Sequence, residues 1–371
     1  MPRYTHMLAE GLKMLGNSVE IWYPKARMVN LTKGKWKKWF GYIDQFFIFP
    51  LEVTFKIRML ALDTLFVITD QALGPWVPLV KKRKHVIHCH DFLAQESAKD
   101  NIKEHKTGVT GKLYQRFIYQ GYSQGKNFIS VSRKTQNDLH RFLGHEPSVS
   151  EVVYNGINKP LAYKNNSESR QVIGKCLGKD LSQGYILHIG GNSWYKNRFE
   201  VVKIYDKLRN LNDIPLPLIL IGQPPTGDLL EARIQSKFAE DIIFVINLDD
   251  KFINDAYSGA TVLLFPSLEE GFGWPIAEAM ASGCPVITTR KDPMMEVAGG
   301  GGIFIDRFER GMDEYIKWLE GAAAVLQKVV QLPELERTKL IEYGLENAKR
   351  FDTNLAIQTI ESIYIRILES K

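Results

Sequence analysis

The stretch Leu264–Arg290 (LFPSLEEGFGWPIAEAMASGCPVITTR) decides the fold of this chain of 371 residues. It reads as a buried strand, a glycine-containing turn, a short helix and a second strand. Glu270 lies in the turn, Glu278 lies eight residues later in the helix, and Gly271 and Gly273 fall where the helix begins. A helix N-terminus offers unpaired N–H groups, and glycine lets a phosphate approach the backbone closely. Because carboxylates accept hydrogen bonds from hydroxyls, the stretch suits a nucleotide that carries a sugar.

Strand-like apolar runs alternate with helical patterns along the whole chain. The strands of a first series are predicted at residues 18–23, 64–69, 85–90, 127–131 and 152–154. Those of a second series are predicted at residues 185–189, 216–221, 242–246, 261–265 and 285–288. This alternation predicts parallel sheets with helices on both faces. The expected fold class is α/β with two Rossmann-like domains, residues 1–160 and 161–351, and a polar segment, residues 159–182, at their boundary.

The start of the first domain departs from a doubly wound fold. Residues 3–15 read as a helix that Gly16 ends. A Rossmann-type domain begins instead with a strand and a glycine-rich turn before its first helix. The sequence therefore predicts a first domain that lacks its first strand, in a chain that either truly starts at Met1 or is cut short.

Composition narrows the functional classes. The net charge of +6 favours anionic partners, but the basic residues form no long stripe and match no nucleic-acid-binding motif, so no nucleic acid is expected. Cys89, Cys176 and Cys284 are widely spaced, which favours a reducing compartment without disulfides or structural zinc. The N-terminus has no apolar signal core, and no stretch of about 18 residues is free of charge. We expect a cytoplasmic protein without a membrane-spanning helix.

Five stretches carry a family resemblance. The first is the E-x7-E signature from Glu270 to Glu278. The others are VIHCHDFLA (86–94), FISVSRKTQNDL (128–139), VVYNGINKP (152–160) and YILHIGGNSWYKNR (185–198). Together they resemble the retaining, nucleotide-sugar-dependent glycosyltransferases with two Rossmann-like domains (GT-B), specifically glycosyltransferase family 4 (glycosyl transferases group 1).

The resemblance implies an architecture and a reaction. The two domains would face a cleft, with the acceptor on the N-terminal domain and the nucleotide sugar on the C-terminal domain. A helix predicted near the C-terminus, within residues 352–371, would pack back onto the first domain. The enzyme would transfer a glycosyl group to the hydroxyl of a glycan or a lipid-linked acceptor, with retention at the anomeric carbon.

The resemblance also implies a set of donor-binding residues. They are Gly191, Lys196, Arg198, Asn247, Leu248, Gly271, Phe272, Gly273 and Glu278. Glu278 would hold the ribose hydroxyls, and Glu270 would contact the donor sugar and stabilise a positively charged transition state. Both acids could instead be solvated carboxylates at a helix start. Phe272 and Trp274 could be core residues, which is the favoured interpretation for Trp274.

Lys196 follows Gly190 and Gly191 in a loop after a predicted strand. Backbone N–H groups and one ammonium would neutralise a diphosphate leaving group without a metal. Many relatives carry an arginine just after this strand, where this chain has Gly191 and Asn192, so Arg198 is the lesser candidate. The alternative is a pair of surface cations after a turn.

His90 and Asp91 lie at the carboxyl end of a predicted strand, where open α/β sheets bind ligands. The resemblance places His90 at the reaction centre and Asp91 and Asn155 on the acceptor side, although Asn155 also reads as an ordinary turn residue. His88 shares the strand face of His90 and is interpreted as structural. A zinc site is disfavoured because Cys89 points to the opposite face.

No metal or other cofactor is expected. The chain has no D-x-D motif, and the adjacent Asp249 and Asp250 look like loop residues. Asn247 and Leu248 follow a predicted strand and would supply backbone contacts to the nucleotide base.

A basic and aromatic stretch precedes the second predicted strand of the first series. Residues 33–39 (KGKWKKW) interleave lysine with tryptophan, and Phe46 and Phe47 follow. Such a mixture suits an anionic membrane surface, so we expect either peripheral contact with the inner face of a membrane through residues 33–47 or a solvated loop with inward tryptophans. Residues 81–84 (KKRK) read as an ordinary charged loop.

The predicted catalytic residues are His90, Lys196 and Glu270. Two other interpretations stay open. The chain could be a catalytically silent relative that acts as a binding or scaffold subunit, or a nucleotide-sugar epimerase that needs no acceptor.

Overall fold

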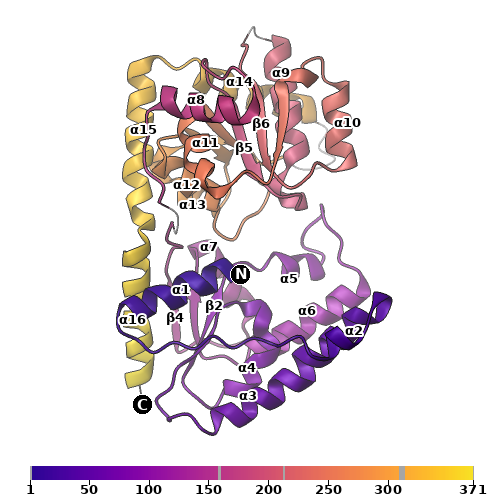
Figure 1. Ribbon diagram of the computed structural model, residues 1–371, viewed down its shortest axis with the longest axis vertical. Helices are drawn as coiled ribbons and strands as arrows, with labels where there is room; N and C mark the ends of the chain where they lie inside the picture. The colour runs from indigo at the N-terminus through magenta and orange to yellow at the C-terminus, as the bar shows by residue number, and fades with distance from the viewer. Residues whose placement is uncertain (1, 158–159, 212–213, 309–313, 371) are drawn as a thin grey trace. The chain divides into compact units, whose positions relative to one another are not determined.

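The computed structural model describes residues 2–157, 160–211, 214–308 and 314–370. Residues 158 and 159, in the matched segment 152–160 and at the start of the polar segment, lie outside this part of the chain. The chain divides into two compact units. Unit 1 comprises the described residues of 1–101, 106–154 and 354–371, and unit 2 comprises those of 102–105 and 155–353. Each unit contains one parallel β-sheet (Figure 1).

The sheet of unit 1 has four parallel strands in the order of the sequence. They are β1 (Phe66–Ile68), β2 (His85–Cys89), β3 (Asn127–Ser130) and β4 (Val149–Val152). The register pairs Ile87 with Phe128, and Phe128 with Ser150. Because neighbouring side chains of a strand point to opposite faces, β2 and β3 supply apolar residues to both sides of the sheet.

Helices cover both faces of this sheet. Those of unit 1 are α1 (Pro2–Met14), α2 (Lys37–Ile43), α3 (Phe49–Ile57), α4 (Val77–Val80), α5 (Leu93–Ala98), α6 (Val109–Tyr122), α7 (Arg133–Phe142) and α16 (Thr353–Glu369). On one face α1 and α16 pack against Val86 and Ile129. On the other face α6 and α7 pack against Ile87 and Phe128. The two ends of the chain thus complete the core of the same unit.

The N-terminal helix precedes every described strand of unit 1. Helix α1 is ended by Gly16, whose φ of +92° favours glycine and whose N–H donates to the carbonyl of Lys13. The first strand, β1, begins only at Phe66. Within the described residues, unit 1 therefore opens with a helix, as predicted for residues 3–15.

The predicted strand at residues 18–23 is wrong. Residues 17–26 form no strand, and β1 is hydrogen-bonded to β2 alone among the described strands. The apolar residues of this segment pack by their side chains instead: Val19 contacts the cluster of α1 and α16, and the ring of Trp22 meets that of Phe66 edge-on at 6.0 Å. Packing, not strand pairing, explains the apolar pattern.

The sheet of unit 2 has six parallel strands in the order β10-β9-β8-β5-β6-β7. They are β5 (Ile186–Gly190), β6 (Leu218–Gly222), β7 (Ile242–Ile246), β8 (Val262–Phe265), β9 (Val286–Thr289) and β10 (Gly302–Ile305). Nine of the ten predicted strands, over both units, overlap observed ones, and β10 was not predicted. The α/β fold class is confirmed.

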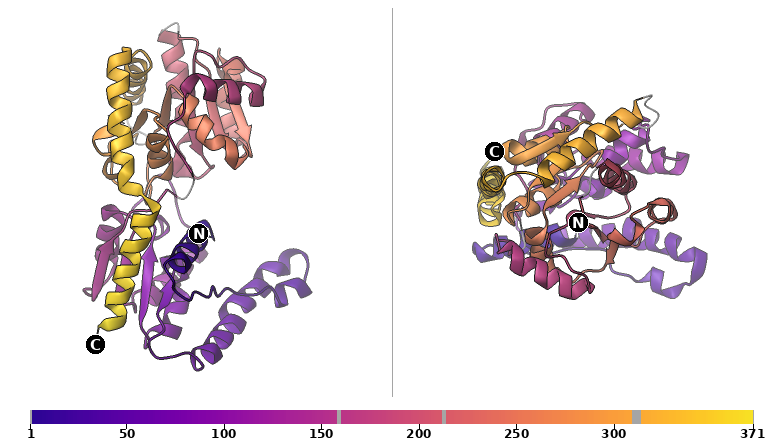
Figure 2. Two further views of the ribbon diagram at one scale, coloured as in Figure 1. Left: turned by 60° about the vertical axis from the view of Figure 1, so that its left-hand side comes forward. Right: turned by 90° about the horizontal axis from the view of Figure 1, so that it is seen from above.

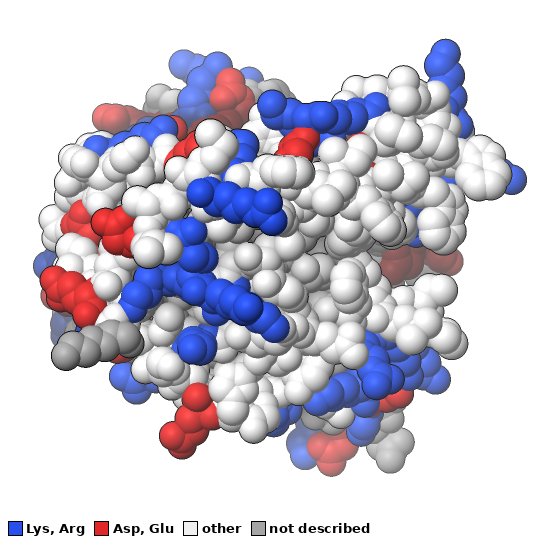
Figure 3. Space-filling view, turned by 90° about the horizontal axis from the view of Figure 1, so that it is seen from below, with Lys and Arg blue, Asp and Glu red and all other residues white. Residues whose placement is uncertain are grey.

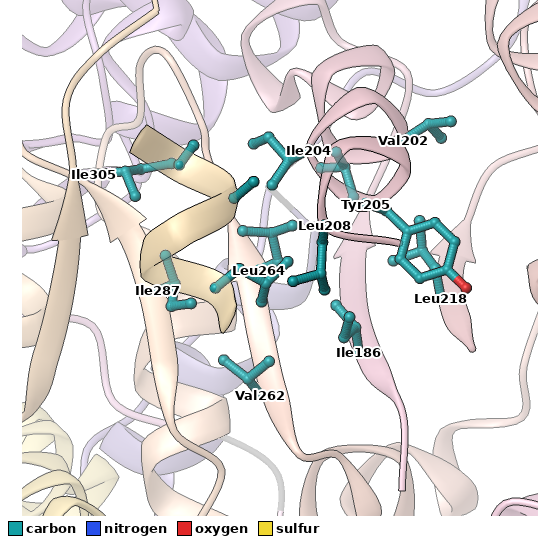
Figure 4. Close-up of a cluster of buried hydrophobic side chains, with 14 of the residues drawn as sticks. Ile186, Val202, Ile204, Tyr205, Leu208, Leu218, Val262, Leu264, Ile287 and Ile305 are labelled. Carbon is teal, nitrogen blue, oxygen red and sulfur yellow. The ribbon is translucent and has the colours of Figure 1, made fainter. Parts of the chain in front are cut away.

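Helices also flank the sheet of unit 2. They are α8 (Asn166–Leu177), α9 (Arg198–Leu211), α10 (Gly227–Gln235), α11 (Ile253–Gly259), α12 (Trp274–Ala281), α13 (Met294–Ala298), α14 (Tyr315–Val330) and α15 (Glu334–Ala348). Helix α9 inserts Val202, Ile204, Tyr205 and Leu208 among apolar side chains of the strands (Figure 4). This rigid core fixes the strand ends from which the site loops leave. Among the described residues, every helix is too short or too polar to span a lipid bilayer.

Candidate functional site

In the sheet of unit 2, the direction in which the chain adds new strands reverses between β5 and β8. The chain adds β6 and β7 on one side of β5, and β8, β9 and β10 lie on the other side. Open α/β sheets bind ligands at the carboxyl ends of the strands at such a switch point. Two loops leave the sheet there, residues 191–197 after β5 and residues 266–273 after β8, and they hold most of the predicted donor residues.

Lys196 and Glu270 form an ion pair that joins these two loops. Nζ of Lys196 lies 2.6 Å from Oε1 of Glu270, and the hydroxyl of Ser267 donates to the same oxygen over 2.8 Å. The side chains are 15% and 9% exposed. Nζ also lies 5.0 Å from the ring centroid of Phe265, a cation–π distance. A cation and an anion are therefore held in fixed positions at the switch point.

The second loop leads directly into helix α12. Gly273 caps this helix with a φ of +103°, and a Cβ atom added there would lie 3.2 Å from Cδ1 of Ile276. Phe272 is buried, and its ring meets the rings of Trp274 and Phe351 edge-on. The glycines thus lie at the helix start, whereas the side chain of Phe272 belongs to the core.

Glu278 lies inside α12 and is buried, with 6% of the residue exposed. Its Oε2 accepts a hydrogen bond of 3.0 Å from the hydroxyl of Tyr257, a fully buried residue of α11. The bond orients the carboxylate, because a buried acid needs hydrogen-bond donors. Tyr257 was not found from the sequence, since nothing local to α11 marks it as a partner of Glu278.

Arg198 is the first residue of α9 and is 5% exposed. Its Nη1 donates to the side-chain oxygen of Asn192 and, over 3.0 Å, to the carbonyl of Gln223. Nε and Nη2 have no hydrogen-bond partner in the described part of the chain. Burial lowers the pKa of the guanidinium. A buried cation with two unused donors is a candidate for contact with an anion.

Gln223 links the loop after β5 to the loop after β6. Its Oε1 accepts the N–H of Asn192 over 2.8 Å and would lie 3.1 Å from a Cβ atom added to Gly191. Position 191 therefore has little room for a side chain. Gln223 comes two residues after the predicted strand 216–221, so the rule that ligand-binding residues follow strand ends could have identified it from sequence.

Asn247 and Leu248 follow β7 at the edge of the sheet. Asn247 is exposed and has a φ of +57°, which is tolerated best by glycine and asparagine. β7 is two strands away from β5, about 10 Å across the sheet. The structure thus places these residues at the same end of the sheet as Lys196, but beside the edge strand.

In unit 1, His90 follows β2 and is 8% exposed. Its Nε2 lies 2.9 Å from the carbonyl of Thr69, and its backbone N–H donates to the side chain of Gln71. Tyr4 meets the ring edge-on at 4.5 Å. Burial lowers the pKa of His90, so the ring is neutral, and the bond to Thr69 places the proton on Nε2 and leaves Nδ1 as the acceptor.

Asp91 accepts the N–H of Leu93 over 3.1 Å at the start of α5, and burial raises the pKa of its carboxyl group. His88 lies between two tyrosines: Nδ1 is 2.7 Å from the hydroxyl of Tyr4, and Nε2 is bonded to that of Tyr364. Both nitrogens of His88 are therefore used to fasten α1 and α16 to β2.

Asn155 belongs to unit 2 and is 3% exposed, and its side-chain oxygen has no hydrogen-bond partner among the described residues. It lies one residue after the boundary that separates the two units. No group of three or more His, Cys, Asp or Glu side chains in the described part of the chain is arranged to hold a metal ion.

A chain with two such parallel-sheet units has the GT-B architecture, and solved structures match it over most of its length. HepE from Anabaena in complex with UDP and glucose is 17% identical, with a TM-score of 0.68 over 95% of this chain and 87% of that one. Sucrose-phosphate synthase from Thermosynechococcus elongatus is 19% identical, with a TM-score of 0.71 over 99% and 93%. At these identities the likeness concerns the fold alone.

The sequence matches two family models. Residues 1–159 match Glycosyltransferase Family 4, and residues 169–322 match Glycosyl transferases group 1. The chain therefore belongs to the group 1 glycosyltransferases of the GT-B type, as the resemblance predicted.

Relatives found by sequence match a smaller share of the chain than these solved structures do. The O-antigen chain mannosyltransferase RfbU of Salmonella typhimurium is 23% identical over 251 residues, which are 66% of this chain and 63% of that protein. The N-acetyl-alpha-D-glucosaminyl L-malate synthase of Bacillus anthracis is 23% identical over 321 residues, 81% of this chain and 80% of that protein. The match thus spans less than two thirds of the first of these relatives.

Proposed function

We propose that this protein transfers a glycosyl group from a nucleotide sugar to an acceptor hydroxyl, with retention of the anomeric configuration. The observation that carries the proposal is the Lys196–Glu270 ion pair at the switch point of unit 2. Support also comes from family membership and from the fold neighbour that binds UDP and glucose. The acceptor would be a glycan or a lipid-linked sugar, in keeping with the O-antigen chain relative.

Each of the residues predicted to bind the donor would contact a different part of the nucleotide sugar. The ammonium of Lys196, the two unused guanidinium nitrogens of Arg198 and the N–H groups at the start of α12 would bind the diphosphate. Glu278, oriented by Tyr257, would accept the ribose hydroxyls. Asn247 and Leu248 would contact the base. Lys196, Arg198 and the backbone N–H groups would together bind the phosphates, so we propose a reaction without a metal ion.

Catalysis would rest on positioning and charge. A retaining transfer without a covalent intermediate lets the acceptor hydroxyl attack on the side of the departing diphosphate, whose oxygen takes the proton. Lys196 stabilises the negative leaving group, and Glu270 stabilises the positive charge that develops on the sugar ring. Neutral His90 and Asp91 of unit 1 would serve the acceptor, with Nδ1 of His90 as a hydrogen-bond acceptor, and Asn155, the first residue of the main segment of unit 2, would also serve the acceptor.

Turnover of single variants tests this assignment. Each of Lys196→Ala and Glu270→Ala should lower kcat by about a hundredfold, equivalent to about 3 kcal/mol, because one charge-stabilising contact is lost. The matched control is Lys207→Ala, which removes a surface ion pair with Glu320 of 2.8 Å in the same unit and should leave kcat unchanged. Nucleotide sugars with different bases and sugars are screened as donors, and NMR of the product reports its anomeric configuration.

Three results would oppose the proposal. Near-wild-type turnover of both site variants would remove the two residues from the mechanism. An inverted product would contradict retention. Conversion of the donor sugar without any acceptor would favour an epimerase, and a folded protein that binds no nucleotide would favour a scaffold subunit.

A further inference from the structure

The helical arm of unit 1, residues 34–57, comprises the 3-10 turn Gly34–Trp36, α2, the π-helical turn Asp44–Ile48 and α3. Figure 2 (left) shows this arm running outward from the sheet of its unit. One face of the arm is buried, through Phe49 at 6% and Val53 at 5% exposure. The arm is nevertheless apolar on its outer face as well, which is unusual for a surface helix.

The outer face of the arm carries an apolar stripe with helical spacing. Phe47, Leu51 and Phe55 follow one another at intervals of four residues and are 69%, 62% and 65% exposed. Met59 and Leu62, just beyond α3, are 87% and 84% exposed. Since isolated exposed apolar residues are common but a continuous stripe is not, the stripe indicates a surface that is covered by something else.

Helix α6 adds a second stripe next to the first. Val109, Leu113 and Phe117 also recur every four residues and are 76%, 62% and 44% exposed. The ring of Phe117 meets the ring of Phe46 at 5.6 Å, so α6 and the arm are in direct contact. The two stripes thus belong to adjoining helices of one unit.

Positive charge accompanies these stripes. Lys33, Lys35, Lys37 and Lys38 are all exposed, and Trp36 and Trp39 between them are 64% and 62% exposed. The tryptophans are therefore not turned inward, in contrast to one of the two sequence-based interpretations. In Figure 3 Lys and Arg side chains gather beside broad uncharged areas on the face seen from below.

The acidic residues of the arm do not offset this charge. Asp44 is 3% exposed and accepts the N–H groups of Arg27, Met28 and Val29 over 2.9 to 3.1 Å. Burial opposes its ionisation, but the three donors outweigh burial and lower its pKa. Glu52 pairs with Arg27. Both acids hold the arm in place instead of meeting a ligand.

We propose that the arm and α6 form a docking surface for an anionic lipid bilayer. The apolar stripes would enter the boundary between headgroups and acyl chains, and the lysines would meet anionic headgroups. A protein partner fits less well, because lysine is depleted in protein interfaces, whereas lysine with tryptophan is typical of membrane interfaces. The inference rests on the proposed function only in one respect: membrane docking would bring the enzyme to lipid-linked acceptors. The docking surface extends the predicted membrane contact beyond residues 33–47.

Vesicle co-sedimentation of the full chain tests the docking surface. Wild type should bind vesicles in which phosphatidylglycerol replaces about a third of the phosphatidylcholine, should bind pure phosphatidylcholine vesicles far more weakly, and should be released by salt. The apolar variant Phe47→Ser/Leu51→Ser/Phe55→Ser and the charge variant Lys35→Glu/Lys37→Glu/Lys38→Glu should each bind at least about tenfold more weakly.

Matched controls change the same chemistry in unit 2. Ile234→Ser/Ile316→Ser/Leu335→Ser removes three apolar residues that are 77%, 67% and 69% exposed. Lys175→Glu/Lys237→Glu/Lys339→Glu reverses three exposed lysines. Both controls should bind anionic vesicles like wild type.

Nucleotide binding, followed by thermal shift with nucleoside diphosphates, separates this inference from the proposed function. The arm variants should keep the wild-type shift. A normal shift without binding of wild type to anionic vesicles, or with equal binding by the arm variants, would overturn the docking surface and leave the proposed function intact. Vesicle binding without any nucleotide shift would overturn the proposed function alone. A concentration-dependent dimer that the apolar variant abolishes would assign the stripes to self-association and overturn the inference.

Discussion

At the scale of single residues, the charged groups of unit 2 fall into two kinds. Lys196 and Glu270 compensate each other across the two site loops. Arg198 is different, because it is buried and, within the part of the chain that the structure describes, its Nε and Nη2 have no hydrogen-bond partner. Desolvation makes such a partly satisfied cation costly, which supports the proposed contact of Arg198 with an anionic ligand.

Acidification should weaken the fold through His188. Its Nδ1 lies 2.9 Å from the carbonyl of Leu264, and burial, aided by the charges of Arg198 and Lys196, lowers its pKa to about 3. In the unfolded chain, His188 binds a proton below its ordinary pKa of about 6.5. In the folded chain, it stays neutral down to about pH 3. In this window the free energy of unfolding should fall by about 1.4 kcal/mol per pH unit for this group.

Urea denaturation at several pH values between about 7 and 5 measures this slope. In His188→Gln, the free energy of unfolding should fall less steeply with decreasing pH than in wild type, by about 1.4 kcal/mol per pH unit. The contribution of His88 in unit 1, whose pKa is also lowered by burial to about 3, should remain in both proteins. Identical slopes for variant and wild type would show that His188 is not held neutral by the fold.

At the scale of elements, the turn between β8 and α12 depends on one backbone conformation. Gly273→Ala should destabilise unit 2 by about 1–2 kcal/mol, because its φ of +103° is unfavourable for residues with a side chain. The control is Gly227→Ala at the first position of α10, where φ is not positive and no atom lies within 4 Å of the added Cβ. Denaturant unfolding should show a loss for the first variant only, and equal stabilities would contradict the strained turn.

The sequence predicts elements well where apolar runs are bounded by turn residues. The strand Ile242–Ile246 was predicted with its observed bounds from its short apolar run, although it lies at the edge of the sheet and is only partly buried. The run 18–23 has the same appearance but no neighbouring strand, and pairing cannot be read from one segment. β10 was missed because Gly299–Gly302 reads as a loop, although the chain enters a strand there.

The candidate site, like the strands, was predictable only in part from the sequence. The positions of Lys196 and Glu270 follow from strand ends, which the apolar pattern marks. Their partners do not, because Tyr257 and Gln223 reach the site from other elements through the tertiary fold. Burial of Arg198 likewise depends on the packing of α9, which a single sequence does not specify.

At the scale of the whole molecule, each unit is a parallel sheet flanked by helices, and the units differ in what their strand order offers. The sheet of unit 1 keeps the order of the sequence, whereas that of unit 2 reverses between β5 and β8. Only the second arrangement provides a switch point within the described strands, and both charged site loops leave the sheet there. The central claim is therefore that unit 2 binds a nucleoside diphosphate at these loops.

Calorimetric titration of the full chain with nucleoside diphosphates tests this claim most directly. Wild type should bind at least one of them, and Lys196→Ala and Arg198→Ala should each weaken binding by about tenfold or more, because a charge-assisted hydrogen bond is lost. Lys207→Ala should bind like wild type. Absence of binding by wild type to every nucleoside diphosphate, or wild-type affinity in both site variants, would contradict the account.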